Sequence, residues 1–155
     1  MENNLSGRAS IMIDASTVKV WEALTTPSII KQYFFGTNAI SDWNEGSSLI
    51  FKGEWEGKSY EDKGTILEKV PMKLFRYNYW SSMSVIEDKP ENYVTITYEL
   101  EERNEETLLT VTQENIPDEK TRQHAEQNWN KVLGNLKQLL EKKPARREKV
   151  SAGAG

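Results

Sequence analysis

One long amphipathic helix near the C-terminal end constrains this 155-residue chain more than any other feature. Between residues 118 and 141 apolar side chains recur every three or four positions, and at about 100° per residue they fall on one stripe. Pro117 and Asp118 predict where the helix begins, and Pro144 lies beyond its end. Such a broad apolar face needs an apolar partner of similar breadth. The stripe consists of Ala125, Trp129, Val132, Leu133, Leu136, Leu139 and Leu140.

The segments before this helix are expected to supply that partner as a sheet. Apolar and polar residues alternate in runs joined by short turn sequences, which predicts consecutive antiparallel strands. Gly64 lies inside one run and predicts a bulge or bend there. Residues 40–46 are expected to form a loop. The predicted strands are residues 9–13, 48–55, 60–70, 74–80, 93–100 and 107–113.

Two short helices are expected after the first strand. Ser16 can cap the first of them, on which Val18 and Trp21 are spaced to lie on the buried face. Pro27 suits the first turn of the second helix, where its missing N–H costs no hydrogen bond, and Gly36 can end that helix. The expected fold class is therefore α+β, with a curved antiparallel sheet of about six or seven strands gripping the long C-terminal helix.

The composition argues against several classes of function. The net charge is −4 without a basic stripe, which disfavours nucleic-acid binding. The chain has no cysteine, so disulfides and thiolate metal sites are excluded. No run of apolar residues is long enough to span a membrane. Residues 1–8 contain no apolar segment typical of a secretory signal, so a cytoplasmic protein is expected.

The chain is expected to form one domain, from residue 1 to residue 143. Residues 144–155 are basic and then small, with too little apolar surface to fold, and are expected to be a disordered tail.

The order of elements resembles the START-like, helix-grip fold, also called the SRPBCC superfamily. Within that superfamily, several segments are similar to the family homologous to the activator of the 90-kDa heat-shock protein ATPase. Ser47 and Asn128 depart from its pattern, which often has glycine at both positions. The similar segments are residues 13–27, 64–71, 74–80 and 106–112.

The resemblance implies a fold directly and a function only through alternatives. Members of the superfamily bind lipids, hormones or polyketides, and a few are enzymes. The leading hypothesis is non-enzymatic binding of a small hydrophobic or aromatic molecule between the sheet and the helix. One alternative is a protein-interaction module that modulates a heat-shock chaperone ATPase, which needs an exposed patch rather than a hollow interior. Another is a cyclase- or hydrolase-like enzyme of the same fold.

The candidate binding site is an aromatic pocket between the sheet and the long helix. Apolar pockets usually carry a few polar groups that fix the orientation of the ligand, here tyrosine hydroxyls and Gln113. Buried hydroxyls on one sheet face are expected to need water or a ligand as partners. No inward Lys or Arg is evident, so a neutral or weakly polar ligand is expected. The expected lining residues are Phe34, Phe51, Trp55, Tyr60, Phe75, Tyr77, Tyr79, Tyr98, Gln113 and Trp129.

No catalytic residue, metal or cofactor is predicted. His124 is the only histidine, and helical spacing places it off the centre of the apolar stripe, so we expect it at the surface. Asp62 and Glu68 share strand parity with inward residues, and an inward carboxylate could act as an acid or a base. A bulge near Gly64 would change that parity.

Overall fold

The computed structural model describes residues 5–81 and 87–141, except for the side chain of Trp55. The predicted tail, residues 144–155, lies outside the described residues. The predicted α+β fold is confirmed, including the two short helices after the first strand. The elements are β1 (Leu5–Ile13), α1 (Thr17–Thr25), α2 (Pro27–Tyr33), β2 (Asn38–Ser41), β3 (Ser48–Trp55), β4 (Lys58–Val70), β5 (Leu74–Tyr79), a 3₁₀ turn (Pro90–Asn92), β6 (Val94–Arg103), β7 (Glu106–Ile116) and α3 (Glu119–Glu141).

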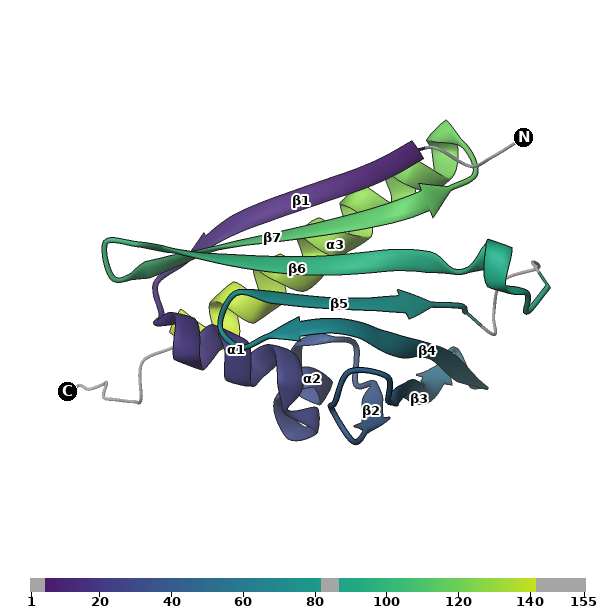
Figure 1. Cartoon of the computed structure of the whole chain (residues 1–155), viewed down its shortest axis with the longest axis horizontal. Helices are drawn as coiled ribbons and strands as arrows, with labels where there is room; N and C mark the ends of the chain where they lie inside the picture. The colour runs from purple at the N-terminus through teal and green to yellow at the C-terminus, as the bar shows by residue number, and fades with distance from the viewer. Residues whose placement is uncertain (1–4, 82–86, 142–155) are drawn as a thin grey trace.

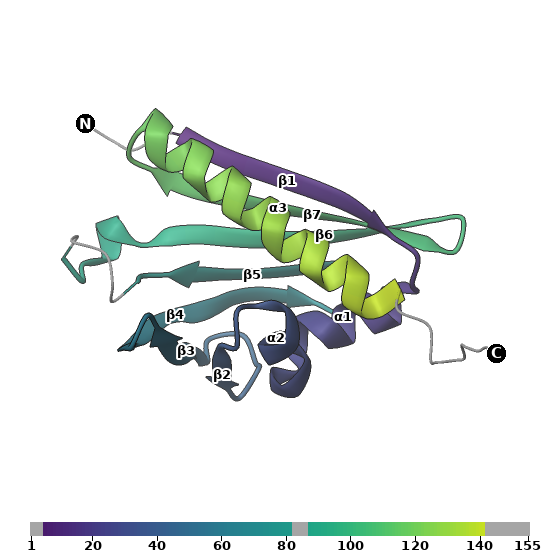
Figure 2. The same cartoon turned by 180° about the vertical axis from the view of Figure 1, so that it is seen from behind.

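The strands form one antiparallel sheet of seven strands in the order β1-β7-β6-β5-β4-β3-β2. The sheet curves, and α3 crosses its inner face diagonally (Figures 1 and 2). Helices α1 and α2 lie beside the C-terminal end of α3, and its N-terminal part runs over the sheet without them (Figure 2). None of the helices in residues 5–81 and 87–141 is long and apolar enough to cross a membrane.

Helix α3 begins and packs as its sequence predicts. The Asp118 carboxylate accepts a hydrogen bond from the backbone N–H of Thr121 at 2.7 Å, which caps the first turn. Leu139 and Leu140, at the far end of the predicted stripe, are only half-buried. The fully packed residues of the stripe are Trp129, Val132, Leu133 and Leu136.

Helix α1 corrects one detail of the prediction. The Ser16 hydroxyl accepts from the backbone N–H of Lys19 at 3.2 Å, as expected of a cap. However, Val18 is 51% exposed, and Val20 packs in the core instead. The cap sets the rotation of this short helix, so a shift of two residues moves a side chain from the core to solvent.

The sequence also missed strand β2, because residues 40–46 were expected to form only a loop. The strand has four residues, and Ala39 is the buried one, opposite Phe51 of β3. A single small inward residue gives no alternation long enough to recognise.

Strand β4 has a register shift between Ile66 and Glu68, beyond the bulge or bend that was predicted at Gly64. A Cβ on Gly64 would lie 1.7 Å from the carbonyl oxygen of Asn78, so only glycine allows β4 and β5 to approach this closely. Beyond the shift, Glu68 pairs with Arg76 at 2.6 Å in a half-exposed position. Glu68 therefore lies outside the interior, and only Asp62 remains as an inward carboxylate of this strand.

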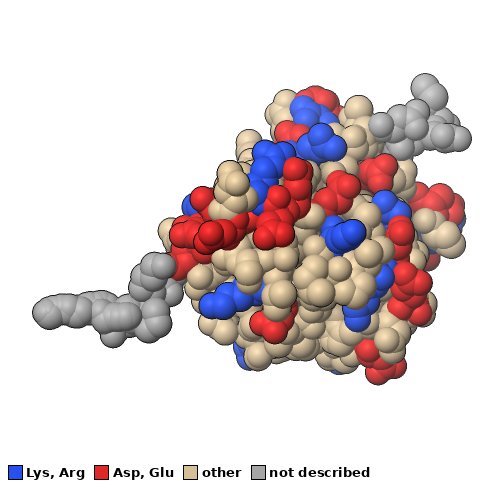
Figure 3. All heavy atoms as spheres, turned by 60° about the vertical axis from the view of Figure 1, so that its left-hand side comes forward, with Lys and Arg blue, Asp and Glu red and all other residues tan. Residues whose placement is uncertain are grey.

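Side chains of α3 also reach the outer edge of β1. Two backbone groups of this edge strand, and one of the residue that follows it, are hydrogen-bonded by charged side chains at distances between 2.6 and 3.0 Å. The Arg8 N–H donates to Glu126, the Asp14 N–H donates to Glu141, and Lys137 donates to the Met12 carbonyl. Elsewhere on the surface, acidic and basic residues are interspersed on the face shown in Figure 3.

Candidate functional site

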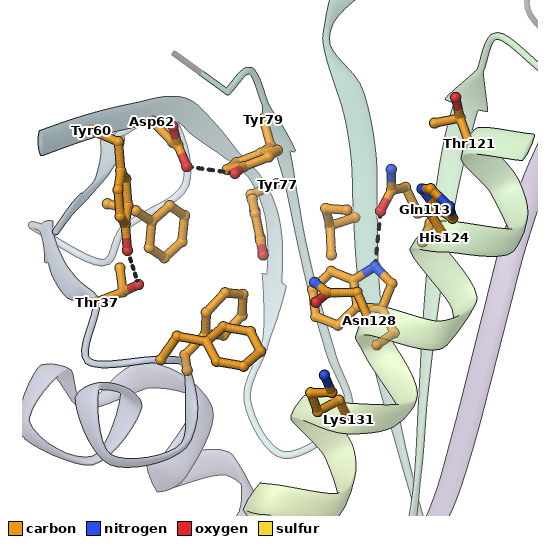
Figure 4. Close-up of a pocket in the computed structure, with 16 residues that line it drawn as sticks. Thr37, Tyr60, Asp62, Tyr77, Tyr79, Gln113, Thr121, His124, Asn128 and Lys131 are labelled. Atoms are coloured by element: carbon orange, nitrogen blue, oxygen red, sulfur yellow. Dashed lines mark hydrogen bonds between the residues drawn. The ribbon is translucent and has the colours of Figure 1, made fainter. Parts of the chain in front are cut away.

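A cavity of about 620 Å³ lies between the sheet and the N-terminal half of α3 (Figure 4). Strands β3 to β7 and the segment that follows α2 supply one wall, and α3 supplies the opposite one. The lining residues are Phe34, Phe35, Thr37, Phe51, Tyr60, Asp62, Tyr77, Tyr79, Ile96, Gln113, Thr121, His124, Ala125, Asn128, Trp129 and Lys131.

The sheet wall is aromatic because strand parity brings its rings to one face. Tyr77 and Tyr79 are two residues apart on β5, and Phe51 faces inward from β3. Tyr60 lies opposite Gly53, and a Cβ on that glycine would lie 2.5 Å from the Tyr60 hydroxyl. The glycine therefore gives the tyrosine ring room to lie across β3.

Two tyrosine hydroxyls at this wall have polar side-chain partners. The Tyr60 hydroxyl lies 2.5 Å from the Thr37 hydroxyl. The Tyr79 hydroxyl donates to the carboxylate of Asp62 at 2.6 Å. Burial and the neighbouring charge of Asp62 raise the pKa of Tyr79 far above its usual range. This hydroxyl therefore stays protonated and remains a donor.

The rings of Tyr77 and Tyr98 are neighbours in the interior, with centroids 6.2 Å apart. Burial raises the pKa of both phenols well above the usual range, so both stay neutral. The expectation that the buried hydroxyls would need water or a ligand was wrong for Tyr79, because Asp62 provides its partner.

The α3 wall is more polar. Thr121, His124 and Asn128 are spaced by three and four residues, so they share one face of the helix with Ala125. The indole N–H of Trp129 donates to the side-chain oxygen of Gln113 at 2.8 Å.

Gln113 is left with a donor that faces the cavity. Its side-chain nitrogen has no hydrogen-bond partner within residues 5–81 and 87–141, and Figure 4 shows the amide on the cavity wall with its oxygen turned to Trp129. A ligand that carries an acceptor can use this N–H group.

The structure brings most of the predicted lining residues together and separates two of them. Phe75 and Tyr98 do not border the cavity. They line a separate space of only about 10 Å³, and their rings contact Trp21 and Trp129, respectively. The side chain of Trp55 lies outside the described residues. Those that border the cavity are Phe34, Phe51, Tyr60, Tyr77, Tyr79, Gln113 and Trp129.

Sequence reasoning missed much of the α3 wall. His124 is exposed, as expected, yet it lies on the rim of the cavity. Lys131 also borders the cavity and is exposed. It was missed because the expectation of no inward Lys or Arg considered only strand residues. The polar spacing of α3 could have revealed this wall, because residues 121, 124, 128 and 131 repeat with the helical period beside the apolar stripe.

The arrangement suits noncovalent binding. Aromatic surface dominates the interior, and the polar groups are confined to a few positions that could orient a ligand. Within the described ranges, no three His, Asp or Glu side chains gather closely enough to hold a metal ion.

Comparison with known proteins agrees with this fold. The model of the family described as "Activator of Hsp90 ATPase homolog 1-like protein" matches residues 14–141. A Cytophaga hutchinsonii protein of known solution structure is 45% identical, with a TM-score of 0.80, over 91% of this chain and 97% of that one. No curated protein sequence matches the chain.

More distant structures share the fold alone. The Aha1 dimer of Colwellia psychrerythraea is 22% identical, with a TM-score of 0.71, over 89% of this chain and 97% of that one. CalU16 of Micromonospora echinospora is 20% identical, with a TM-score of 0.69, over 92% of this chain and 86% of that one.

Proposed function

We propose that this chain, which belongs to the family of Activator of Hsp90 ATPase homolog 1-like proteins and has a helix-grip fold, binds a small, largely apolar molecule between the sheet and α3. The cavity is the observation that carries this proposal. Its volume of about 620 Å³ lies within the range of about 300–1,000 Å³ that is usual for small-molecule sites.

The chemistry of the walls supports the same proposal. Phe34, Phe51 and Tyr79 contribute ring surface, and Gln113 contributes an N–H donor. Phe35 is 43% exposed at the rim, with a positive φ of 55° that turns the chain after α2. An exposed ring beside an aromatic interior gives an apolar molecule a first contact on its way in.

The family description names an activator of a chaperone ATPase, so an interaction module remains the alternative function. The two functions place different demands on the interior. A module that acts through its surface can have a filled core, whereas a ligand site requires space. The large cavity favours ligand binding.

The test is to fill the cavity without disturbing the rest of the fold. Ala125 lines the cavity from α3, so Ala125→Phe should place a ring in the space and lower the affinity for an apolar fluorescent probe by about tenfold or more. Gln127→Phe is the matched control, because it adds the same ring to an exposed position on the same helix. Probe titration and calorimetry measure both.

Equal probe affinity in the wild type and both variants would place binding outside the cavity and contradict the proposal. No probe binding in any of them, together with stimulation of a heat-shock chaperone ATPase by the wild type, would support the interaction module instead.

A further inference from the structure

The charge lining the sheet wall of the cavity is negative and buried. Asp62 is 7% exposed and stands directly opposite Phe51 in the pairing of β3 with β4. The next residue back along the strand, Glu61, has the opposite parity and forms an exposed ion pair with Lys52 at 3.7 Å. Of these two neighbouring carboxylates, Asp62 therefore borders the cavity and Glu61 does not.

Aromatic rings surround this carboxylate. Tyr60 lies two residues before Asp62 on the same strand, Tyr79 donates a hydrogen bond to it, and Phe51 is its cross-strand partner. Figure 4 shows Asp62, Tyr60 and Tyr79 together at one end of the cavity. The faces of aromatic rings carry negative electrostatic potential and attract organic cations, most strongly where water is excluded.

The basic residues of the cavity stand on the other wall. His124 and Lys131 project from α3, and both are exposed. Figure 4 places them across the cavity from Asp62. Neither of them forms an ion pair with Asp62, since the described ion pairs of this chain do not join α3 to β4.

We infer that the cavity selects an organic cation, namely a small molecule with an ammonium group on an apolar body, whose cationic end lies against Asp62 and the rings of Tyr60, Tyr79 and Phe51. This inference rests on the proposed function and names the class of its ligand. It requires only the negative charge of Asp62, which the hydrogen bond from Tyr79 does not neutralise. It replaces the sequence-based expectation of a neutral ligand, which rested on the absence of an inward Lys or Arg.

A matched pair of probes tests the inference on the whole chain. 2-Naphthylmethylammonium and 2-naphthylmethanol have nearly the same shape, and only the first is charged at neutral pH. Quenching of the emission of the five Trp residues should show the ammonium probe binding about tenfold more tightly than the alcohol.

Two variants locate the source of that preference. Asp62→Asn keeps the size of the side chain and removes its charge, so it should lower the affinity for the ammonium probe to that for the alcohol. Glu61→Gln makes the same change of net charge on the outer face, and should keep the full preference. Circular dichroism confirms that each variant is folded.

A second measurement does not depend on the folding of Asp62→Asn. In the wild type, nuclear Overhauser contacts should join the CH₂ group beside the probe nitrogen to the rings of Tyr60 and Tyr79. Contacts from that group to His124 and Asn128 instead would overturn the inference.

The outcomes separate this inference from the proposed function. If both probes bind equally in the wild type, or if Asp62→Asn keeps the preference, the cation inference is wrong and the proposed function stands. If neither probe binds and Ala125→Phe changes no other binding, both are overturned.

Discussion

The space between the sheet and α3 is filled at one end and hollow at the other. At the filled end, Leu133 and Leu136 of α3 are at most 1% exposed, and a pocket lined by Phe75 and Tyr98 measures only about 10 Å³. At the hollow end, the same helix presents Ala125 and Asn128 to a cavity of about 620 Å³. One helix on one sheet thus produces both a close-packed core and a cavity.

The difference arises from what lies beside α3. Helices α1 and α2 cover the filled end, where Trp21 packs edge-on against Phe75 with ring centroids 6.1 Å apart. No helix covers the space beside the N-terminal half of α3 in the described part of the chain. Trp129 marks the boundary, because it lines the cavity and its ring is nearly perpendicular to those of Phe34, which also lines the cavity, and of Tyr98, which does not. The packing of an interior therefore depends on its neighbours as much as on its own two faces.

Removing an aromatic ring from either end should have the largest effect on stability and should show the clearest difference between the two ends. Phe75 is 1% exposed at the filled end, so Phe75→Ala should lower the free energy of unfolding by about 3–5 kcal/mol. Phe51, 8% exposed, already borders empty space, so Phe51→Ala should cost about 1–2 kcal/mol less than Phe75→Ala. Urea unfolding measures both. Equal losses would mean that the hollow end is packed in solution.

Adding volume should give a smaller effect on stability, again larger at the filled end than at the hollow end. Ala23 is completely buried at the filled end, so Ala23→Leu should lower the free energy of unfolding by about 1–3 kcal/mol through overpacking. Ala125→Leu adds the same atoms beside the cavity and should change stability by less than about 1 kcal/mol. Thermal unfolding checks the pair, and a large loss in Ala125→Leu would argue against the cavity.

Lowering the pH should have the smallest effect on stability, through Glu119 in the first turn of α3. The hydrogen bond from Arg122 lowers the pKa of Glu119 to about 2, below its value in an unfolded chain. A carboxyl with a lowered pKa stabilises the fold above the unfolded value, of about 4.3, and this contribution is lost as the pH falls towards 2. The loss of stability between pH 5 and pH 2 should therefore be slightly smaller in Glu119→Gln. Because Glu119 is exposed, a large difference would contradict this account.

The packing of the filled end could be predicted from the sequence, because the spacing of apolar residues indicates which side chains are buried. Leu136 falls on the helical stripe, and Phe75 falls on the inward parity of its strand, so both positions follow from spacing alone. The same reasoning succeeded for the antiparallel pairing of consecutive strands from β3 to β7, but it did not predict that β1 pairs with β7. It failed for β2, where only Ala39 is inward, and for Phe75 as a lining residue of the pocket.

The hollow end could be predicted only in part, because a cavity is defined by what is missing. Parity placed Tyr77, Tyr79 and Phe51 on the correct face, but it could not show which of the inward rings would remain uncovered. Strand parity also did not predict that the Tyr79 hydroxyl donates to Asp62 or that the Trp129 indole N–H donates to Gln113. Such partners depend on the register of β4 with β5 and on the position of α3 over β7, which are set by the whole sheet.

The contacts between α3 and the edge of β1 bear on how this protein behaves at high concentration. A sheet edge with free N–H and C=O groups can pair with a strand of another molecule, and this is a common start of aggregation. Here Glu126 and Lys137 occupy groups of Arg8 and Met12 on that edge, and Glu141 occupies one of Asp14 directly after it. The opposite edge strand, β2, is only four residues long. The long helix that encloses the cavity thus also shields the sheet from other copies of the chain. Loosening this helix would expose both the interior and a sheet edge that can pair with a strand of another molecule.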